Sequence, residues 1–493
     1  MTVDILCKVV DNLGDIGFAY RLARALSELP EAPALRLIVD DLVAFSGLCP
    51  GVDPALPLQR VGEWTVARWD SPGAEAESLF RAERPRAVLE CYACGRPDWL
   101  EAILFDADDP VPRAIVNLEY LTAESWARDF HRLPSLTRSP LVRKAVFMPG
   151  LEPGTGGLVQ DRAFTALLSD CATSGGLYAA RRSALDSLSA YGAIEPPADF
   201  DPAAAFWFLA FSYEHDFTAI VADLARFGAD RPVLALVAAG RSSGPFLDAW
   251  SRAGRPFPVL KLPLVPQPLW DRLLVASDFA IVRGEESFAR ACLSGRPFLW
   301  ECYPFAGSGD GGVKTSSAPG VSANGGVTTN GGNAPMDGHL PKVRAFLERI
   351  RPFLPPEDYA RYEGLTLAFN GARGEKKTCG EPNSPGELNS RGEKSNRGES
   401  TIRGEQTPGE SATHGEIILP GELLSILRAV TPRSSVATGE TGASASETLI
   451  SSPKTAQNSP KTGFSAGFAE WASGVRNLGN LAANLMTFLR DLV

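Results

Sequence analysis

Residues 4–26 read DILCKVVDNLGDIGFAYRLARAL, and this stretch decides the fold. Its apolar beginning, Asp4–Val10, predicts a buried strand, and the turn DNLGDIG follows. From Phe18 to Leu29 apolar residues recur at helical spacing. A strand, a glycine-containing turn and a helix are the opening of a doubly wound α/β domain.

Short continuous apolar runs, typical of parallel sheets, continue along the chain. In the first half they predict strands at Leu35–Val39, Ala87–Cys91 and Ala114–Val116. In the second half strands and helices alternate, with strands expected at Phe206–Phe211, Val233–Val237, Val259–Leu262, Phe279–Val282 and Phe298–Trp300. The pattern predicts two Rossmann-like domains, residues 1–165 and 196–369, with ligands at the carboxyl ends of the strands.

Glycine is concentrated in two segments, residues 306–335 and 370–462, which contain no aromatic residue. Such segments cannot bury enough apolar surface to offset their conformational entropy. We therefore expect an insertion at 306–335 within the second domain and a low-complexity linker over 370–462. The linker carries Gly-Glu at six-residue intervals, and an interaction tail is the alternative interpretation. Helical spacing returns over 464–493, which we expect to join the first domain.

Composition and charge indicate which partners, compartment and metal sites to expect. The net charge is −10, and an acidic protein repels phosphate backbones, so we expect no nucleic-acid partner. No apolar run of 18 residues occurs and the N-terminus does not resemble a signal peptide, so we expect a cytoplasmic protein without a membrane partner. Cys91 and Cys94 form a C-x-x-C without a second pair, which favours buried small residues over a metal site.

Asp11 and Asp15 are the first candidates for chemistry, because they follow the first strand where a doubly wound fold exposes its ligand. Two neighbouring carboxylates can raise one pKa and provide a general base. The alternative is that one aspartate caps the following helix. The segment lacks the G-x-G-x-x-G dinucleotide fingerprint.

A second candidate site lies in the second half, at RGEES, residues 283–287. Arg283 beside a helix N-terminus suits a pyrophosphate, although an ordinary helix cap is the alternative. Phe211 and Tyr213 follow another strand and either stack on a ligand or pack in the core. Gln267 begins a helix and is weak evidence for base recognition. Local signatures of serine hydrolases, zinc proteases and P-loop NTPases are absent from the sequence.

Several segments together resemble the EarP-type protein-arginine rhamnosyltransferases, which act in the maturation of translation elongation factor P. The resemblance is carried by residues 4–26 and by IVNLEYLTAESW, PGLEPGTGGL, FSYE and SDFAIVRGEESFARACLSGRPFLWECYP, which begin at residues 115, 149, 211 and 277. It implies a GT-B fold, two Rossmann-like domains facing a cleft. It also implies transfer of L-rhamnose from dTDP-β-L-rhamnose to an arginine of elongation factor P, with inversion and without a metal or cofactor.

The resemblance also assigns roles to residues. Asp15 would be the catalytic base, Asp11 its acidic neighbour, and Glu285 a further catalytic residue on the donor side. Substrate-binding roles fall on Asn12, Gly14, Phe211, Tyr213, Gln267, Arg283, Glu286, Ser287 and Tyr303, with the diphosphate near Arg283, Ser287 and Tyr303 and the thymine near Gln267. Glu286 stands where the family usually has Asp, and Leu264 where an aromatic residue is usual. Another GT-B transferase, an epimerase of the same fold and a non-catalytic factor-binding homologue remain as alternatives.

Overall fold

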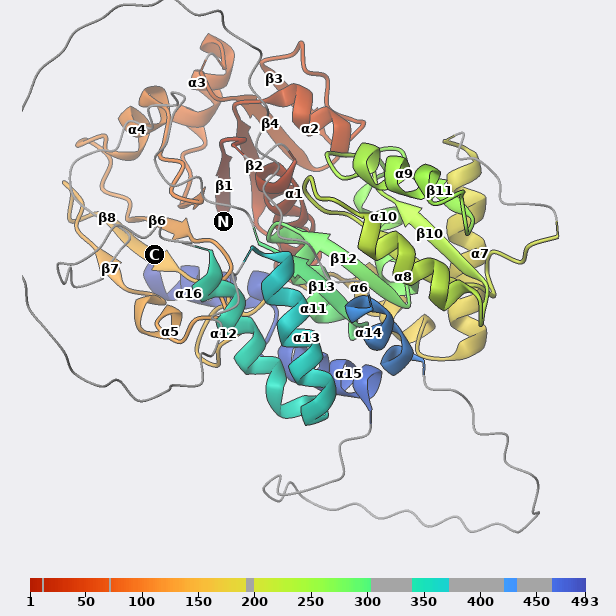
Figure 1. Cartoon of the computed structure of the whole chain (residues 1–493). Helices are drawn as coiled ribbons and strands as arrows, with labels where there is room; N and C mark the ends of the chain where they lie inside the picture. The colour runs from red at the N-terminus through yellow and green to blue at the C-terminus, as the bar shows by residue number, and fades with distance from the viewer. Residues whose placement is uncertain (11–12, 71, 192–198, 303–338, 372–420, 432–462) are drawn as a thin grey trace, which may run out of the picture.

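Two sheets form the centre of the computed structural model, which describes all residues except 11–12, 71, 192–198, 303–338, 372–420 and 432–462 (Figure 1). The first sheet has the strand order β3-β4-β2-β1-β5-β6-β8-β7. Its six inner strands pair in parallel and its two edge strands are antiparallel. The strands are β1 (Thr2–Cys7), β2 (Ala34–Val39), β3 (Leu58–Val61), β4 (Trp64–Arg68), β5 (Ala87–Cys91), β6 (Arg113–Leu118), β7 (Pro134–Ser135) and β8 (Val142–Phe147).

The second sheet is parallel throughout, with the order β11-β10-β9-β12-β13. Its inner strands are completely buried, which explains their continuous apolar sequences. The strands are β9 (Phe206–Ala210), β10 (Val233–Val237), β11 (Val259–Lys261), β12 (Phe279–Arg283) and β13 (Phe298–Glu301). All five strands of this sheet were predictable as apolar runs, to within one residue at most ends.

Helices connect the strands and cover both sheets (Figure 1). In the first domain they are α1 (Gly14–Ser27), α2 (Leu42–Leu48), α3 (Ala74–Ala82), α4 (Asp98–Leu104) and α5 (Ala127–Phe130). Two helices, α6 (Arg162–Asp170) and α7 (Ser174–Ser189), pack against α10 of the second domain. The expected boundary at residue 165 therefore falls inside α6. The second domain contributes α8 (Thr218–Gly228), α9 (Ser243–Arg252), α10 (Gln267–Ala276), α11 (Glu286–Ser294), α12 (Leu340–Ile350), the 3-10 helix η1 (Arg351–Phe353) and α13 (Pro356–Phe369).

The two-domain α/β architecture confirms the expected fold, that of GT-B proteins. The first sheet is larger than expected, because β3, β4, β7 and β8 were not predicted. β3 and β7 are antiparallel edge strands with few buried residues, so they lack the apolar run by which the other strands were found. In β8 exposed and partly buried residues interrupt the buried ones, which has the same effect.

The C-terminal segment is not one helix docked on the first domain, as expected, but two helices that divide between the domains. α15 (Phe464–Arg476) buries Phe468 and Trp471 in the core of the second domain. α16 (Leu481–Leu492) buries Leu485 in the core of the first. The break lies at Gly479, whose φ of +103° favours glycine, and at Asn480, whose Oδ1 accepts the Ala482 amide and caps α16.

The linker expected over 370–462 contains a further helix, α14 (Glu422–Val430), which is a correction to that expectation. It packs against α8 and α13 and buries Ile426 and Leu427. Asp223 of α8, itself fully buried, accepts the amides of Gly421 at 2.8 Å and Leu424 at 3.1 Å. Residues 372–420 and 432–462 of that segment and the insertion at 306–335 lie outside the described residues.

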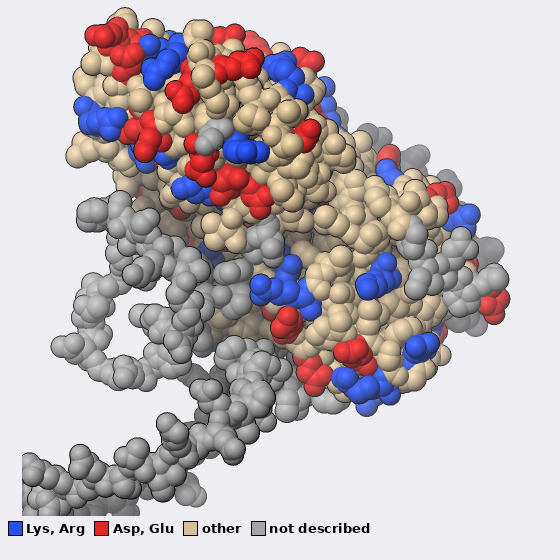
Figure 2. Space-filling model, turned by 90° about the horizontal axis from the view of Figure 1, so that it is seen from above, with Lys and Arg blue, Asp and Glu red and all other residues tan. Residues whose placement is uncertain are grey.

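Two further properties of the described residues are the distribution of surface charge and the hydropathy of the helices. Acidic and basic side chains are interspersed on the face seen in Figure 2. Among the described helices, none combines the length and the apolar character that crossing a membrane requires.

Burial of α16 against the first sheet predicts a measurable contribution to stability. Leu485 is completely buried, so Leu485→Ala should lower the free energy of unfolding by about 2–5 kcal/mol. Leu136→Ala, at a fully exposed leucine of the same domain, is the matched control and should change it by less than about 0.5 kcal/mol. Equal effects in chemical denaturation would contradict the docking of α16.

Candidate active site

Asp15 lies in the first turn of α1, just beyond the carboxyl end of β1. α1 begins at Gly14, and Leu13 occupies its N-cap position without a side-chain cap, so Asp15 is not the residue that caps this helix. Its side chain is buried and its Oδ2 accepts the Val10 amide at 2.8 Å. A carboxylate in the first turn of a helix interacts favourably with the positive end of the helix dipole.

Glu285 lies in the second domain, at the N-cap position of α11. Its Oε2 accepts the Leu121 amide of the first domain at 2.8 Å, and Lys342 of α12 lies 3.1 Å from its Oε1. Burial raises the pKa of Glu285, and the negative charge of Asp15 adds to this rise. The Lys342 ammonium group and the Leu121 amide act in the opposite direction and lower the pKa. Glu285 therefore lies at a contact between the two domains and within electrostatic reach of Asp15.

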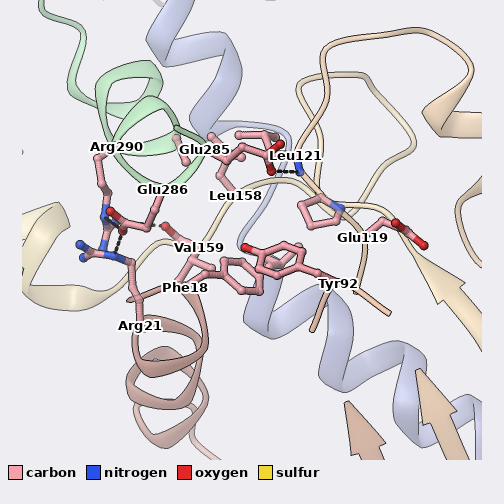
Figure 3. A pocket seen from close by; sticks show the side chains of 13 residues that line it. Phe18, Arg21, Tyr92, Glu119, Leu121, Leu158, Val159, Glu285, Glu286 and Arg290 are labelled. Carbon is pink, nitrogen blue, oxygen red and sulfur yellow. Dashed lines mark hydrogen bonds and ion pairs between the residues drawn. The ribbon is translucent and has the colours of Figure 1, made fainter. Parts of the chain in front are cut away.

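A pocket between the domains joins these elements (Figure 3). The cavity that these residues enclose is small, about 30 Å³. Phe18 and Tyr92 form an aromatic wall, with ring centroids 5.3 Å apart, and Tyr92 also stacks on Tyr120 at 4.1 Å. Glu119, Glu285 and Glu286 also line the pocket, together with Arg21 and Arg290, which pair with Glu286. Aromatic faces and carboxylates together suit a cationic, planar group.

Arg283 lies at the end of β12 between two aromatic rings of the loop after β9. Its guanidinium is 4.7 Å from the centroid of Phe211 and 4.6 Å from that of Tyr213. Among the described carboxylates, none is within ion-pair distance of Arg283. The structure thus brings Arg283, Phe211 and Tyr213 together. The guanidinium lies between the two rings and next to the N-terminus of α11, where positive charge favours an anion.

The loop that carries Tyr213 is fixed by Glu301, at the end of β13, which the sequence analysis did not identify. Glu301 accepts the Ser212 hydroxyl at 2.6 Å and the Tyr213 amide at 2.8 Å, and His215 lies 2.6 Å away. The sequence does contain a signal for Glu301, because this carboxylate directly follows the apolar run Phe298–Trp300. Lys342, also missed, offers no such signal because it lies 57 positions from Glu285.

Other predicted residues occupy different places. Glu286 directs its carboxylate to Arg21 and Arg290 instead of the space around Arg283 (Figure 3). Gln267 is buried and donates to the Gly17 carbonyl of α1 at 2.8 Å. Ser287 is buried in the first turn of α11. Leu264 is half-exposed, and the predicted residues Asp11, Asn12 and Tyr303 lie outside the described part of the chain.

The C-x-x-C lies where the sequence predicted it. Cys91 ends β5 and is buried, and Cys94 in the following turn is partly buried with its Sγ 3.4 Å from the Leu6 carbonyl oxygen. Across the described residues, no group of three His, Cys, Asp or Glu side chains has an arrangement that could hold a metal ion.

Comparison with known proteins identifies the family. Residues 3–308 match the model described as Elongation-Factor P (EF-P) rhamnosyltransferase EarP. The chain belongs to the EarP family. A protein-arginine rhamnosyltransferase of Pseudomonas putida is 37% identical over 315 residues, 61% of this chain and 76% of that relative. Another, from Pseudomonas aeruginosa, is 30% identical over 388 residues, 75% and 87% of the two chains.

A solved structure is also similar, one described as the structural basis for EarP-mediated arginine glycosylation of translation elongation factor EF-P. It shares 23% identity, covers 75% of this chain and 84% of its own, and has a TM-score of 0.40. The family match includes both Asp15 and Glu285. Membership of the EarP family makes the chain a glycosyltransferase, as the resemblance implied.

The contact between Lys342 and Glu285 predicts a change in titration. Lys342→Met removes an opposing charge, so the pKa of Glu285 should rise further above that of an ordinary glutamate. The carboxyl resonance of Glu285, followed by ¹³C NMR and assigned with Glu285→Gln, should then titrate at higher pH. Lys342→Arg retains the charge and is the control. A midpoint that is unchanged in Lys342→Met would show that the lysine does not control this carboxyl group.

Proposed function

We propose that this chain transfers L-rhamnose from dTDP-β-L-rhamnose to an arginine side chain of EF-P, with inversion at the anomeric carbon. One observation carries the proposal: Asp15 of the first domain and Glu285 of the second lie at the starts of α1 and α11, the two helices whose residues line a pocket of aromatic rings and carboxylates. Membership of the EarP family supports the choice of sugar and acceptor.

The acceptor needs a carboxylate base. An arginine guanidinium has a pKa above 12 and no free lone pair, so its nitrogen attacks carbon only when a proton is localised or removed. Asp15, buried at the start of α1, would accept that proton. Asp11, four positions earlier in the same turn, is proposed as its acidic neighbour. Phe18, Tyr92 and Glu119 line the space through which the planar cation would enter.

The donor needs positive charge at its diphosphate. Arg283, held between Phe211 and Tyr213, and the N-terminus of α11 would bind it, with Ser287 close by and Tyr303 completing the site. Gln267 would read the thymine. Its Oε1 is buried and has no hydrogen-bond partner among the described residues, which suits the N3–H donor of that base.

The reaction is a single displacement. A guanidine nitrogen of the acceptor forms a bond to C1 of rhamnose while the bond from C1 to the β-phosphate oxygen breaks. The nitrogen's proton passes to Asp15, and dTDP leaves with the bonding electron pair, its charge stabilised by Arg283. Attack opposite the leaving group converts the β-linked donor into an α-linked product. No cofactor takes part in this proposed sequence.

The direct test is intact-mass analysis of EF-P after incubation with dTDP-L-rhamnose and the full-length protein. We expect the mass of one deoxyhexose residue to be added, and fragmentation should place it on arginine. Donor binding without transfer would overturn the proposal in favour of a non-catalytic homologue. Conversion of the nucleotide sugar without EF-P would instead indicate an epimerase.

Substitution of Asp15 should separate catalysis from binding. Asp15→Asn keeps the shape but cannot take the proton, so kcat should fall by about 10²–10⁴-fold while the Kd for dTDP-rhamnose changes little. Arg283→Gln is the complementary variant and should weaken donor binding by about 10-fold or more. Kinetics and calorimetric titration measure the two effects. If Asp15→Asn instead loses donor affinity, Asp15 is a binding residue.

A further inference from the structure

Five charged side chains form a cluster buried where the two domains meet, which we call the interdomain cluster. Arg21 binds Asp271 through two hydrogen bonds, Nη1 to Oδ2 at 2.7 Å and Nη2 to Oδ1 at 3.1 Å. Its Nε donates to Glu286, and its Nη1 lies 3.6 Å from Asp161. Arg290 completes the cluster by pairing with Asp161, and its Nε is 3.5 Å from Asp271.

Arg21 is the member of this cluster that belongs to the first domain. It projects from α1, whereas Glu286 and Arg290 lie in α11 (Figure 3). Asp271 lies in α10. Asp161 caps α6, which packs on α10. Arg21 is almost fully buried. A planar guanidinium that binds one carboxylate with two hydrogen bonds and a second with its Nε fixes orientation as well as distance.

The two helices joined by Arg21 are the ones that carry the site. α1 begins beside Asp15, and Arg21 is six residues further on, about 9 Å along a rigid helix. On the other side, Glu286 follows Glu285 and lies three residues after Arg283. Gln267 adds a second link to α1 through the Gly17 carbonyl oxygen. Any rotation of α1 against α11 would therefore change the position of Asp15 relative to Arg283.

We infer that Arg21 is a positioning residue that holds Asp15 at the correct place relative to the donor, with Glu286 and Asp271 as its partners. This inference rests on the proposed function. It also gives Glu286 a different role from the one the family resemblance implied, since its carboxylate pairs with Arg21 and would orient α1. Glu286 is one methylene longer than the usual Asp and reaches Nε of Arg21.

The charges of the cluster argue for positioning over simple stability. Two arginines face three carboxylates, and all five side chains are removed from most of the solvent. Burial of such groups costs free energy that their attraction only partly offsets, so an apolar joint would hold the domains at least as well. Directional hydrogen bonds, unlike an apolar contact, fix one orientation of α1 relative to α10 and α11.

The experiment compares Arg21→Lys and Arg21→Gln in the full-length protein, with EF-P and dTDP-rhamnose as substrates. Lysine keeps the charge but loses the bidentate geometry, and glutamine loses both. We expect kcat to fall about 10-fold in Arg21→Lys and about 10²-fold in Arg21→Gln, since misplacement of a reacting group by about 1 Å has effects of this size. The Kd for dTDP-rhamnose should stay within about 3-fold.

Arg36→Gln is the matched control. Arg36 is also buried and also binds one carboxylate with two hydrogen bonds, Nε to Asp4 Oδ1 at 2.6 Å and Nη2 to Asp4 Oδ2 at 3.0 Å. That pair lies within the first domain, between β1 and β2. Its loss should lower the melting temperature without changing kcat when activity is assayed well below that temperature.

A double-mutant cycle with Glu286→Gln tests whether the pair acts as a unit. If it does, Arg21→Gln with Glu286→Gln should reduce kcat no more than Arg21→Gln alone. A folded Arg21 variant with the kcat of the unmodified protein would overturn the inference, as would a loss of donor affinity equal to the loss of kcat. If Arg21→Gln does not fold, Arg21→Lys decides by the same criteria. Absence of transfer by the unmodified protein would instead overturn the proposed function.

Discussion

The contact of α1 with both domains is the constraint on which the site depends. The carboxyl ends of the two parallel sheets each expose part of the chemistry, Asp15 beside β1 and Arg283 beside β12. Neither domain can carry out the proposed reaction alone, because the base of one and the donor site of the other must lie within reacting distance. α1 belongs to the first sheet, yet its Arg21 and the Gly17 carbonyl oxygen bind groups of α10 and α11.

Other segments reinforce the same joint. α15 and α16 are separated by a turn at Gly479, so one C-terminal segment contributes to the cores of both domains. The Leu121 amide reaches Glu285 from the loop after β6. Leu121, Glu285 and Leu481 of these segments line the pocket, so a change in the angle between the domains would alter its geometry.

Much of this architecture could be predicted from the sequence, for a physical reason. Strands buried on both faces, such as β9 and β10, are continuous apolar runs bounded by turns, and a parallel sheet places its ligands at their carboxyl ends. That rule indicated Asp15 and the segment RGEES as candidate sites, whereas the catalytic role of Glu285 came from the family resemblance. Strands such as β3 and β7 were missed because none of their residues is fully buried. α14 was missed because nine residues with an apolar face stand inside a polar, repetitive segment.

The direction in which a side chain points could not be predicted in the same way. Glu285 and Glu286 are adjacent in the sequence and share the start of α11, but successive positions on a helix face about 100° apart. Glu285 therefore meets Leu121 and Lys342, while Glu286 meets Arg21 and Arg290. Which neighbour has which role depends on residues up to 265 positions away in the chain. A motif such as RGEES thus identifies where a site lies, and only the packing of the domains separates the residue that faces the substrate from the one that holds the domains in place.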